Sequence, residues 1–194
     1  MSCKNTQHRF SCSKTRSTDT WRLVLTTTAH LHHRTLLPPT ATRPQALSLF
    51  RSHDKLIRLD PDLSSYEEVP APATAKDDTK YYKVTDVMHA LPAGLWDSTV
   101  AFAAEITDIE NGVEWVVRAP LGLVQRTLFT IEEASDDDLC GEQDPEKKSG
   151  RLALVEDVEI RCSRLLVGTV KGKIEGNWKG IHKRWIEHLA TMEQ

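Results

Sequence analysis

The stretch RLLVGTVKGKIEGNWKGIHKRWIEHLATMEQ, residues 164–194, decides the fold. Its apolar side chains recur at steps of three and four residues, which at about 100° per residue places them along one stripe of an α-helix. The members of this stripe are Leu166, Val170, Ile174, Trp178, Ile181, Trp185, Leu189 and Met192. We therefore predict a long amphipathic helix whose apolar stripe packs on another apolar surface.

Four glycines are spaced four residues apart on the opposite side of this predicted helix: Gly168, Gly172, Gly176 and Gly180. Each glycine costs roughly 0.8–1 kcal/mol relative to alanine in a helix interior. Charged residues interrupt the segment throughout, so it does not match a membrane-spanning helix. We interpret the glycines as a weakened, solvent-facing side of the helix. A flexible lid or a contact with a partner helix is the alternative interpretation.

Upstream of the helix, hydrophobicity alternates with a period of two residues in several segments joined by turns, which indicates antiparallel strands. A strand, two short helical segments between Thr42 and Leu59, and further strands precede the long helix. The dipeptide Asn111-Gly112 predicts a tight hairpin turn, because both residues tolerate positive φ angles. The strands are expected at about 29–37, 63–69, 81–88, 99–106, 113–119, 123–132 and 152–162. This order predicts an α+β fold, a curved antiparallel sheet of six to seven strands around the C-terminal helix.

Length and composition describe one folded domain. The chain has 194 residues, of which 39% are hydrophobic, enough for a single core. A formal net charge of -3 argues against a general attraction to nucleic acid. Four cysteines form no C-x-x-C pair, and no segment resembles a secretory signal, so we expect reduced thiols and a cytoplasmic protein. No run of apolar residues reaches membrane-spanning length.

The first 28 residues differ in composition from the rest of the chain. They are rich in serine and threonine and basic, with Asp19 as their only acidic residue. We predict a disordered N-terminal tail over residues 1–28 and a folded domain over residues 29–194. A mitochondrial targeting signal is the alternative, although the apolar island at residues 21–25 is short for one.

Several local phrases carry a resemblance to a known family. They are HHRTLLPPTATRPQALSLFRSHDKLIRLDPD (32–62), YYKVTDV (81–87), LPAGLWDSTVAF (91–102), VRAPLGL (117–123) and LVEDVEIRCSRLLVGTVKGKIE (154–175). With the order of elements, they resemble an uncharacterised fungal family of the START-like (helix-grip, SRPBCC) superfamily. That superfamily includes pollen-allergen-type ligand binders, lipid-transfer domains and polyketide cyclases. The resemblance implies this fold and a cavity between sheet and helix, and it implies no catalytic residues.

Two acidic residues interrupt apolar rows of the predicted strands. Glu156 stands in a row of leucine, valine and isoleucine, and Asp86 follows Tyr82 and Val84 in another. Strand alternation turns both carboxylates toward the helix side of the sheet. A buried carboxylate needs a partner, water or ligand, so both are candidate ligand anchors or acid/base groups. The alternative is that each bonds a backbone amide or an arginine, or lies in water at a strand end.

Aromatic side chains on the same elements complete a candidate pocket, although packing in an ordinary core is the alternative. The predicted ligand-binding residues are Tyr82, Asp86, Trp96, Phe102, Trp115, Phe129, Glu156 and Trp178. No metal site is predicted, because His30 and His32 share a strand face but have no third ligand with suitable spacing. The acidic run at residues 136–138 lacks the ligand pattern of a calcium loop. We interpret Cys162 as a buried structural thiol.

These observations favour a binding protein for a small hydrophobic or lipid-like ligand, held between the sheet and the terminal helix. A cofactor-free cyclase- or hydrolase-like enzyme in the same cavity is one alternative, with Asp86 or Glu156 as acid or base. A protein-interaction module with a filled core is another. We predict no cofactor, no nucleic-acid partner and no assigned catalytic residue, and the oligomeric state stays open.

Overall fold

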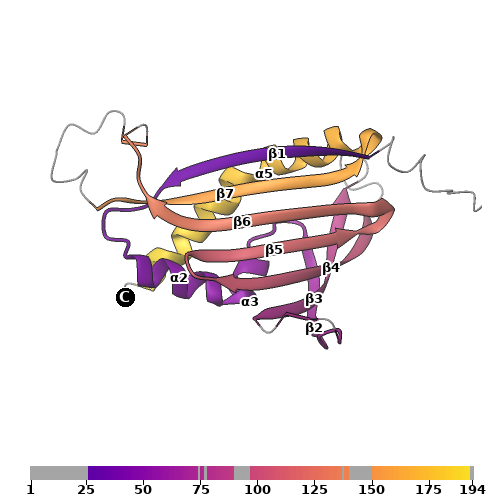
Figure 1. The fold of residues 1–194 in the computed structure, drawn as a ribbon, viewed down its shortest axis with the longest axis horizontal. Helices are drawn as coiled ribbons and strands as arrows, with labels where there is room; N and C mark the ends of the chain where they lie inside the picture. The colour runs from indigo at the N-terminus through magenta and orange to yellow at the C-terminus, as the bar shows by residue number, and fades with distance from the viewer. Residues whose placement is uncertain are drawn as a thin grey trace, which may run out of the picture.

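A computed structural model describes residues 26–73, 75–76, 78–89, 97–136, 138–139 and 150–192. In this part of the chain, seven strands form one antiparallel sheet and three α-helices accompany it (Figure 1). The strands are β1 (Thr26–Leu36), β2 (Leu63–Val69), β3 (Thr79–His89), β4 (Asp97–Ile109), β5 (Gly112–Ala119), β6 (Leu123–Glu133) and β7 (Leu152–Ser163). The helices are α2 (Arg43–Arg51), α3 (His53–Ile57) and α5 (Arg164–Thr191), with a 3-10 turn, η1, at Pro120–Gly122.

The order of strands across the sheet is β1-β7-β6-β5-β4-β3-β2. The last strand of the chain therefore lies beside the first, and β1 and β2 form the two edges. Helix α5 follows β7 directly and lies behind the curved sheet in Figure 1, with α2 and α3 below its C-terminal end. The predicted α+β helix-grip fold is confirmed, including the two short helices after the first strand.

The two halves of α5 are packed differently. Ser163 caps the helix by accepting a hydrogen bond from the amide of Leu165 at 3.1 Å. The first half lies on a small cluster that β1 and β7 form, and it stays partly exposed. In the second half, Trp185 and Leu189 are buried in the main core, where the Trp185 ring lies 5.0 Å from the ring of Phe50. The C-terminal half therefore anchors the helix.

The ends and the back of α5 differ partly from the sequence prediction. Met192, predicted on the apolar stripe, is 38% exposed because the helix ends at Thr191. A Cβ atom added at Gly168, Gly172, Gly176 or Gly180 would meet no other atom within 4 Å. These glycines therefore face open space, as the solvent-facing interpretation predicts.

The predicted hairpin at Asn111-Gly112 forms, but for a different physical reason. Ile109 pairs with Gly112, so residues 110 and 111 make the turn, and Gly112 opens β5. Gly112 is needed because a Cβ atom there would lie 1.8 Å from the carbonyl oxygen of Phe129 on β6. Positive φ angles occur instead in the next turn, at Leu121 (61°) and Gly122 (75°).

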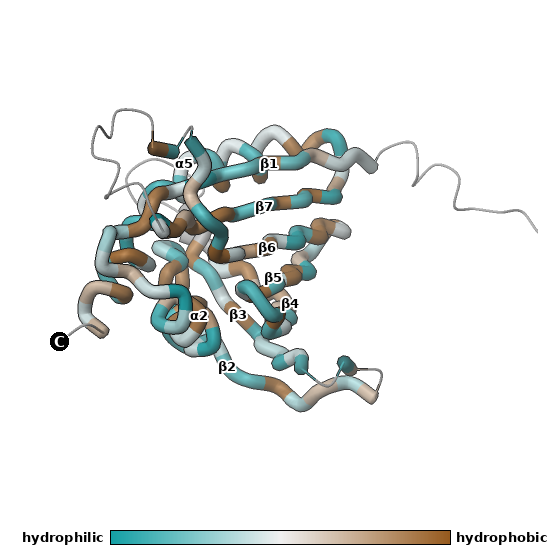
Figure 2. The backbone as a smooth tube through the Cα atoms, turned by 60° about the vertical axis from the view of Figure 1, so that its left-hand side comes forward, coloured by the Kyte–Doolittle hydropathy of each residue, from teal (hydrophilic) through white to brown (hydrophobic). Residues whose placement is uncertain are grey.

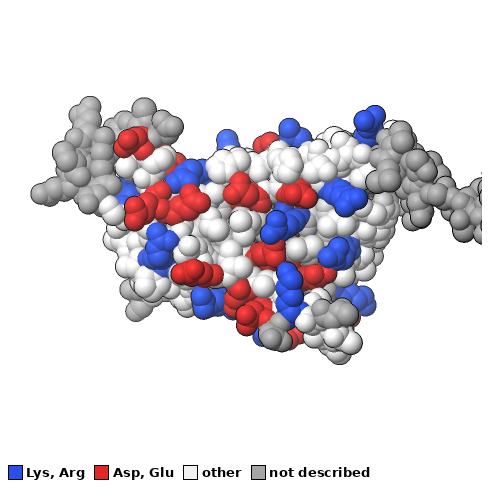
Figure 3. All heavy atoms as spheres, viewed as in Figure 1, with Lys and Arg blue, Asp and Glu red and all other residues white. Residues whose placement is uncertain are grey.

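The outer face of the sheet is covered by charges of both signs (Figure 3). Cross-strand ion pairs join Lys83 to Glu67 at 3.1 Å and Arg118 to Glu105 at 2.6 Å. Along the strands these polar residues alternate with apolar ones that face the helices (Figure 2). Exposed pairs of this kind contribute about 0–1 kcal/mol each. The outer face is thus an ordinary solvated surface, and the inner face is where a ligand site would lie.

Strand β1 begins at Thr26, earlier than the start at about residue 29 that the sequence analysis predicts. Residues 26–28, assigned there to the tail, pair with residues 161–163 of β7, and all three are threonines that suit an extended strand. Residues 1–25, Trp96 and the cysteines Cys3, Cys12 and Cys140 lie outside the described residues. Among the helices described, none is long and apolar enough to cross a membrane.

Candidate functional site

Glu156 of β7 points to the inner side of the sheet, as its strand alternation predicts, and is only 4% exposed. Its cross-strand neighbour in β1 is His33, which is 6% exposed. The Nδ1 atom of His33 lies 2.9 Å from Oε2 of Glu156. The buried carboxylate therefore has an imidazole partner, where the sequence analysis considered an arginine or a backbone amide.

A second histidine reaches the same carboxylate from α5. His182 is 1% exposed, and its Nε2 lies 3.3 Å from Oε2 of Glu156. This distance allows an ion pair, but the two groups are not aligned for a hydrogen bond, and Nε2 finds no other partner among the described residues. The other ring nitrogen, Nδ1, lies 2.7 Å from the hydroxyl oxygen of Thr35 on β1. Side chains from three elements thus meet at one carboxylate.

Trp178 of α5 contacts both histidines from the helix side. Its ring stacks on His33 at 4.6 Å with an angle of 7° between the planes, and meets His182 edge to face at 5.3 Å. The Nε2 atom of His33 lies 3.4 Å from Glu175, a half-exposed residue one turn earlier on α5. We call this group the Glu156 centre: Thr35, Glu156, His33, His182, Trp178 and Glu175.

The arrangement of the Glu156 centre is well suited to proton transfer. Each imidazole has both of its nitrogens next to an oxygen atom. Hydroxyl, imidazole and carboxylate groups alternate from Thr35 through His182, Glu156 and His33 to Glu175. Because imidazole can both give and accept a proton, His33, which lies within hydrogen-bond distance of both carboxylates, can pass a proton between the buried Glu156 and the half-exposed Glu175.

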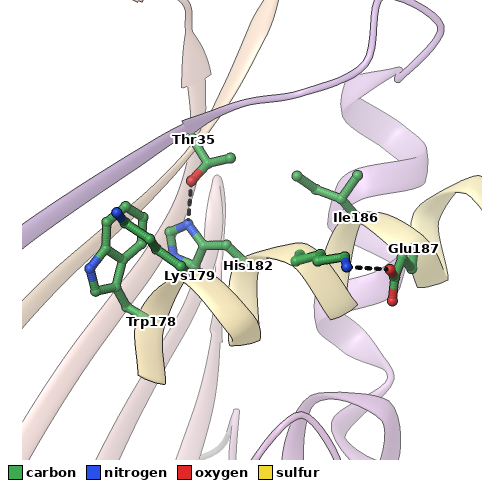
Figure 4. A pocket seen from close by; sticks show the side chains of 7 residues that line it. Thr35, Trp178, Lys179, His182, Ile186 and Glu187 are labelled. Atoms are coloured by element: carbon green, nitrogen blue, oxygen red, sulfur yellow. Dashed lines mark hydrogen bonds and ion pairs between the residues drawn. The ribbon is translucent and has the colours of Figure 1, made fainter. Parts of the chain in front are cut away.

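An open groove runs along the same side of α5 (Figure 4). Its volume is about 420 Å³, and its surface is almost wholly apolar. The lining residues are Thr35, Trp178, Lys179, His182, Lys183, Ile186 and Glu187. In Figure 4 the Thr35 hydroxyl points toward the His182 ring across the gap between β1 and α5. Thr35 and the almost fully buried His182 therefore both belong to the lining of an apolar groove, with their hydrogen bond beside it.

Asp86 forms a separate polar site on β3. It is 4% exposed, and its Oδ1 atom has no hydrogen-bond partner among the described residues. Burial, reinforced by the negative charge of Asp60, raises the pKa of Asp86 to about 6. The charge of Lys173 on α5 opposes this shift, while its ammonium group lies 2.9 Å from Asp62. Asp86 and Glu156 are thus both buried, but they belong to different clusters.

This shift makes the stability of the protein depend on pH. Because the pKa of Asp86 rises from 3.8 to about 6 on folding, the folded state holds the proton more tightly. The stabilisation is complete below pH about 4 and is lost as the pH rises through about 6. Asp86→Asn removes the ionisation, so its unfolding free energy relative to wild type should rise by roughly 1–3 kcal/mol between pH about 4 and 7.

Urea denaturation of both proteins across this pH range measures the difference. The exposed turn variant Glu110→Gln serves as a control and should run parallel to wild type. If the unfolding free energies of Asp86→Asn and wild type changed in parallel with pH, the pKa of Asp86 would be the same in the folded and unfolded protein, which would contradict the shift.

Of the other predicted ligand-binding residues, the four described aromatic ones lie in or against the main core. Tyr82 is buried, its hydroxyl lies 2.9 Å from Nδ1 of His53, and burial raises its pKa to about 12. Phe129 is buried against Phe50, with ring centres 6.1 Å apart. Phe102 and Trp115 are partly buried and pack on the same core. Among the predicted residues that the structure describes, Glu156 and Trp178 alone are brought together in the Glu156 centre.

Sequence analysis missed His33, His182 and Thr35. It singled out His30 and His32, whereas His32 lies on the outer face beside Asp157 and is exposed. Strand alternation could have found His33, because it is two residues from the inward-facing Leu31. Helical spacing could have found His182, which is four residues after Trp178.

No set of three or more His, Cys, Asp and Glu side chains among the described residues is arranged to hold a metal ion. Cys162 is buried, and burial raises its thiol pKa, which disfavours the reactive thiolate.

Several solved structures share the fold at low sequence identity. Norcoclaurine synthase from Thalictrum flavum, in complex with dopamine and hydroxybenzaldehyde, has a TM-score of 0.57 and 12% identity, with 98% of each chain covered. Zhui aromatase/cyclase from Streptomyces sp. R1128 has a TM-score of 0.59 and 9% identity, covering 87% of this chain and 97% of that one. Ara h 8.0201 has a TM-score of 0.54 and 15% identity, covering 85% and 99%.

These likenesses show a helix-grip, SRPBCC-like fold and leave the ligand open. A comparison with curated proteins gives no match. A family model described as a domain of unknown function, DUF7053, matches residues 26–191. This match extends from the first residue of β1 to the last residue of α5. The chain therefore belongs to the DUF7053 family.

Proposed function

We propose that the protein binds a small, mainly apolar ligand with one polar group in the groove between β1 and α5. The observation that supports this proposal is that Thr35 and His182, which are hydrogen-bonded to each other, both line an apolar groove of about 420 Å³. Small-molecule sites commonly occupy about 300–1,000 Å³ and combine an apolar lining with a few polar groups. The apolar part of the ligand would lie on Trp178 and Ile186, and its polar group would bond Thr35 or His182.

The Glu156 centre is costly to the fold, which supports a role beyond packing. Glu156, His33 and His182 are each more than nine-tenths buried. Burying such groups costs free energy even when they are paired, and apolar side chains of similar size would often stabilise the same position equally well. Glu156 is not among the residues that line the groove. We propose that Glu156 acts indirectly, by holding the His182 ring in its position beside the groove.

The other residues predicted to bind the ligand would contact it or support its site. Phe102, Trp115 and Asp86 face the helix side of the sheet and would contact a longer ligand that extends beneath α5, as would Trp96 of the sequence prediction. Tyr82 and Phe129 would support the site from within the core. We also propose that the ligand is lipid-like and that the protein is fungal and cytoplasmic. The fold neighbours support the ligand class, since one of them is a complex with dopamine and hydroxybenzaldehyde.

Titration with the fluorescent apolar probe 8-anilinonaphthalene-1-sulfonate tests the proposal. The full chain should bind the probe saturably, and Trp178→Leu should weaken binding by up to about tenfold, since an aromatic pair contributes about 0.5–1.5 kcal/mol beyond the area it buries. Met192→Leu, on the exposed end of the same helix, is the matched control and should bind like wild type. Circular dichroism checks that both variants fold.

Unchanged binding by a folded Trp178→Leu variant would place the probe elsewhere and contradict the proposed groove. Absence of saturable binding by wild type would favour the remaining alternative, a protein-interaction module with a filled core.

A further inference from the structure

Three members of the Glu156 centre have the arrangement of an activated hydroxyl nucleophile. The Thr35 hydroxyl oxygen lies 2.7 Å from Nδ1 of His182, and Nε2 of the same ring lies 3.3 Å from Oε2 of Glu156. A hydroxyl group, an imidazole and a buried carboxylate therefore follow one another in a line. Nucleophilic enzymes use this order, in which the base contacts the nucleophile and a third group orients the base.

The surroundings of these three residues suit this chemistry. Glu156 is buried, and it also accepts a hydrogen bond from His33, which fixes the position of its Oε2 atom. The negative charge of Glu156, 3.3 Å from Nε2 of His182, favours the tautomer with its proton on Nε2, which leaves Nδ1 free to take the hydroxyl proton of Thr35. The Trp178 edge packs on the His182 ring and limits its rotation. The imidazole is thus held in an orientation in which it can act as a base.

The groove indicates the class of substrate. Thr35 and His182 both line it; Thr35 is partly exposed, whereas His182 is 1% exposed, so a bound molecule would meet the Thr35 hydroxyl first, with the imidazole behind it. The exposed surface of the lining is mostly apolar, which suits an acyl chain, and Lys179 adds a positive charge at the wall. Lys183 and Glu187, which also line the groove, pair with each other at 3.8 Å. Positive charge stabilises the negative oxygen that develops when a carbonyl carbon is attacked.

We propose that the groove is an esterase site for esters of apolar carboxylic acids, with Thr35 as nucleophile, His182 as general base and acid, and Glu156 as positioning residue. This proposal rests on the proposed function, because the same groove holds the substrate. It adds a reaction to the binding and requires no metal or cofactor.

The reaction balances with water as the only co-reactant. Thr35 Oγ bonds to the ester carbonyl carbon while its proton passes to Nδ1 of His182. The bond to the leaving alcohol oxygen breaks, and His182 returns the proton to that oxygen. Water then attacks the acyl-Thr35 carbon and gives a proton to His182, the bond to Oγ breaks, and the proton moves to Oγ. The products are one alcohol and one carboxylic acid.

The test uses p-nitrophenyl octanoate and the full chain. Wild type should hydrolyse this activated ester saturably and form an acyl adduct that peptide mass spectrometry maps to Thr35. Thr35→Val keeps the shape of the side chain without its hydroxyl, and it should lose the adduct and at least tenfold of kcat/KM. Thr35→Ser keeps a hydroxyl and should retain both. His182→Asn should lower kcat more than it raises KM.

Binding of 8-anilinonaphthalene-1-sulfonate to the Thr35→Val variant separates the two proposals. Saturable probe binding that is retained, even if weakened, together with lost hydrolysis supports both the binding site and the esterase. Saturable probe binding by wild type without hydrolysis above the Thr35→Val rate would overturn the esterase and leave the binding function standing. Acylation confined to lysine or histidine side chains, with Thr35→Val as active as wild type, would also overturn it.

Discussion

Trp185→Ala should destabilise the protein more than any other single substitution considered for α5. Trp185 is 2% exposed and packs on Phe50, so it connects the terminal helix to the helices that follow β1. Truncating a buried tryptophan costs about 3–5 kcal/mol through lost burial and the cavity left behind. For a domain of this size the melting temperature should fall by roughly 6–20 °C.

Thermal unfolding followed by circular dichroism measures this loss. Met192→Ala removes a partly exposed side chain from the end of the same helix and should change the melting temperature by only a few degrees. A Trp185→Ala variant as stable as Met192→Ala would mean that the second half of α5 does not anchor the fold.

Glu156→Ala should have the second-largest effect on stability. The Glu156 carboxylate is the partner of His33 at 2.9 Å and lies 3.3 Å from His182. Its removal therefore leaves both buried imidazole rings without their carboxylate neighbour. Removing one member of a buried ion pair costs about 3–5 kcal/mol. Urea denaturation should therefore show an unfolding free energy reduced by about this amount.

The neighbouring residue offers a matched control. Asp157 also pairs with a histidine of β1, His32, at 2.7 Å, but both side chains are more than half exposed. Exposed pairs contribute about 0–1 kcal/mol, so Asp157→Ala should be nearly neutral. The two variants therefore differ in burial while the chemistry and the pair of strands stay the same. Equal effects of Glu156→Ala and Asp157→Ala would contradict the buried Glu156 centre.

The fold could be predicted from the sequence because its signals are local. Strand alternation, the helical stripe and turn dipeptides each depend on residues close in the chain. Gly112 shows the limit of such signals, since the hairpin was predicted correctly but the need for glycine comes from the backbone of Phe129 on β6. The sequence alone does not show which strand approaches that closely.

The candidate site was predictable only in part. Alternation alone identified Glu156 and Asp86 as inward-facing, and both are buried. Their partners depend on long-range geometry: His33 meets Glu156 through the pairing of the first and last strands, and His182 through the path of α5. The surroundings of the aromatic residues depend on long-range packing in the same way. Tyr82 and Phe129 have the spacing of pocket residues, yet α2 and α3 bring core residues such as Phe50 and His53 against them.

The most direct test of the proposed ligand site is the response of the individual tryptophans to a bound probe. The chain has five tryptophans, and each contributes one indole N–H signal to a ¹H–¹⁵N spectrum. Substitution of each tryptophan by phenylalanine assigns the signals. On titration with 8-anilinonaphthalene-1-sulfonate, the Trp178 indole and the Thr35 amide should shift saturably with one common Kd, while the buried Trp185 stays nearly fixed. Saturable shifts that leave Trp178 and Thr35 unmoved would contradict a ligand site between β1 and α5.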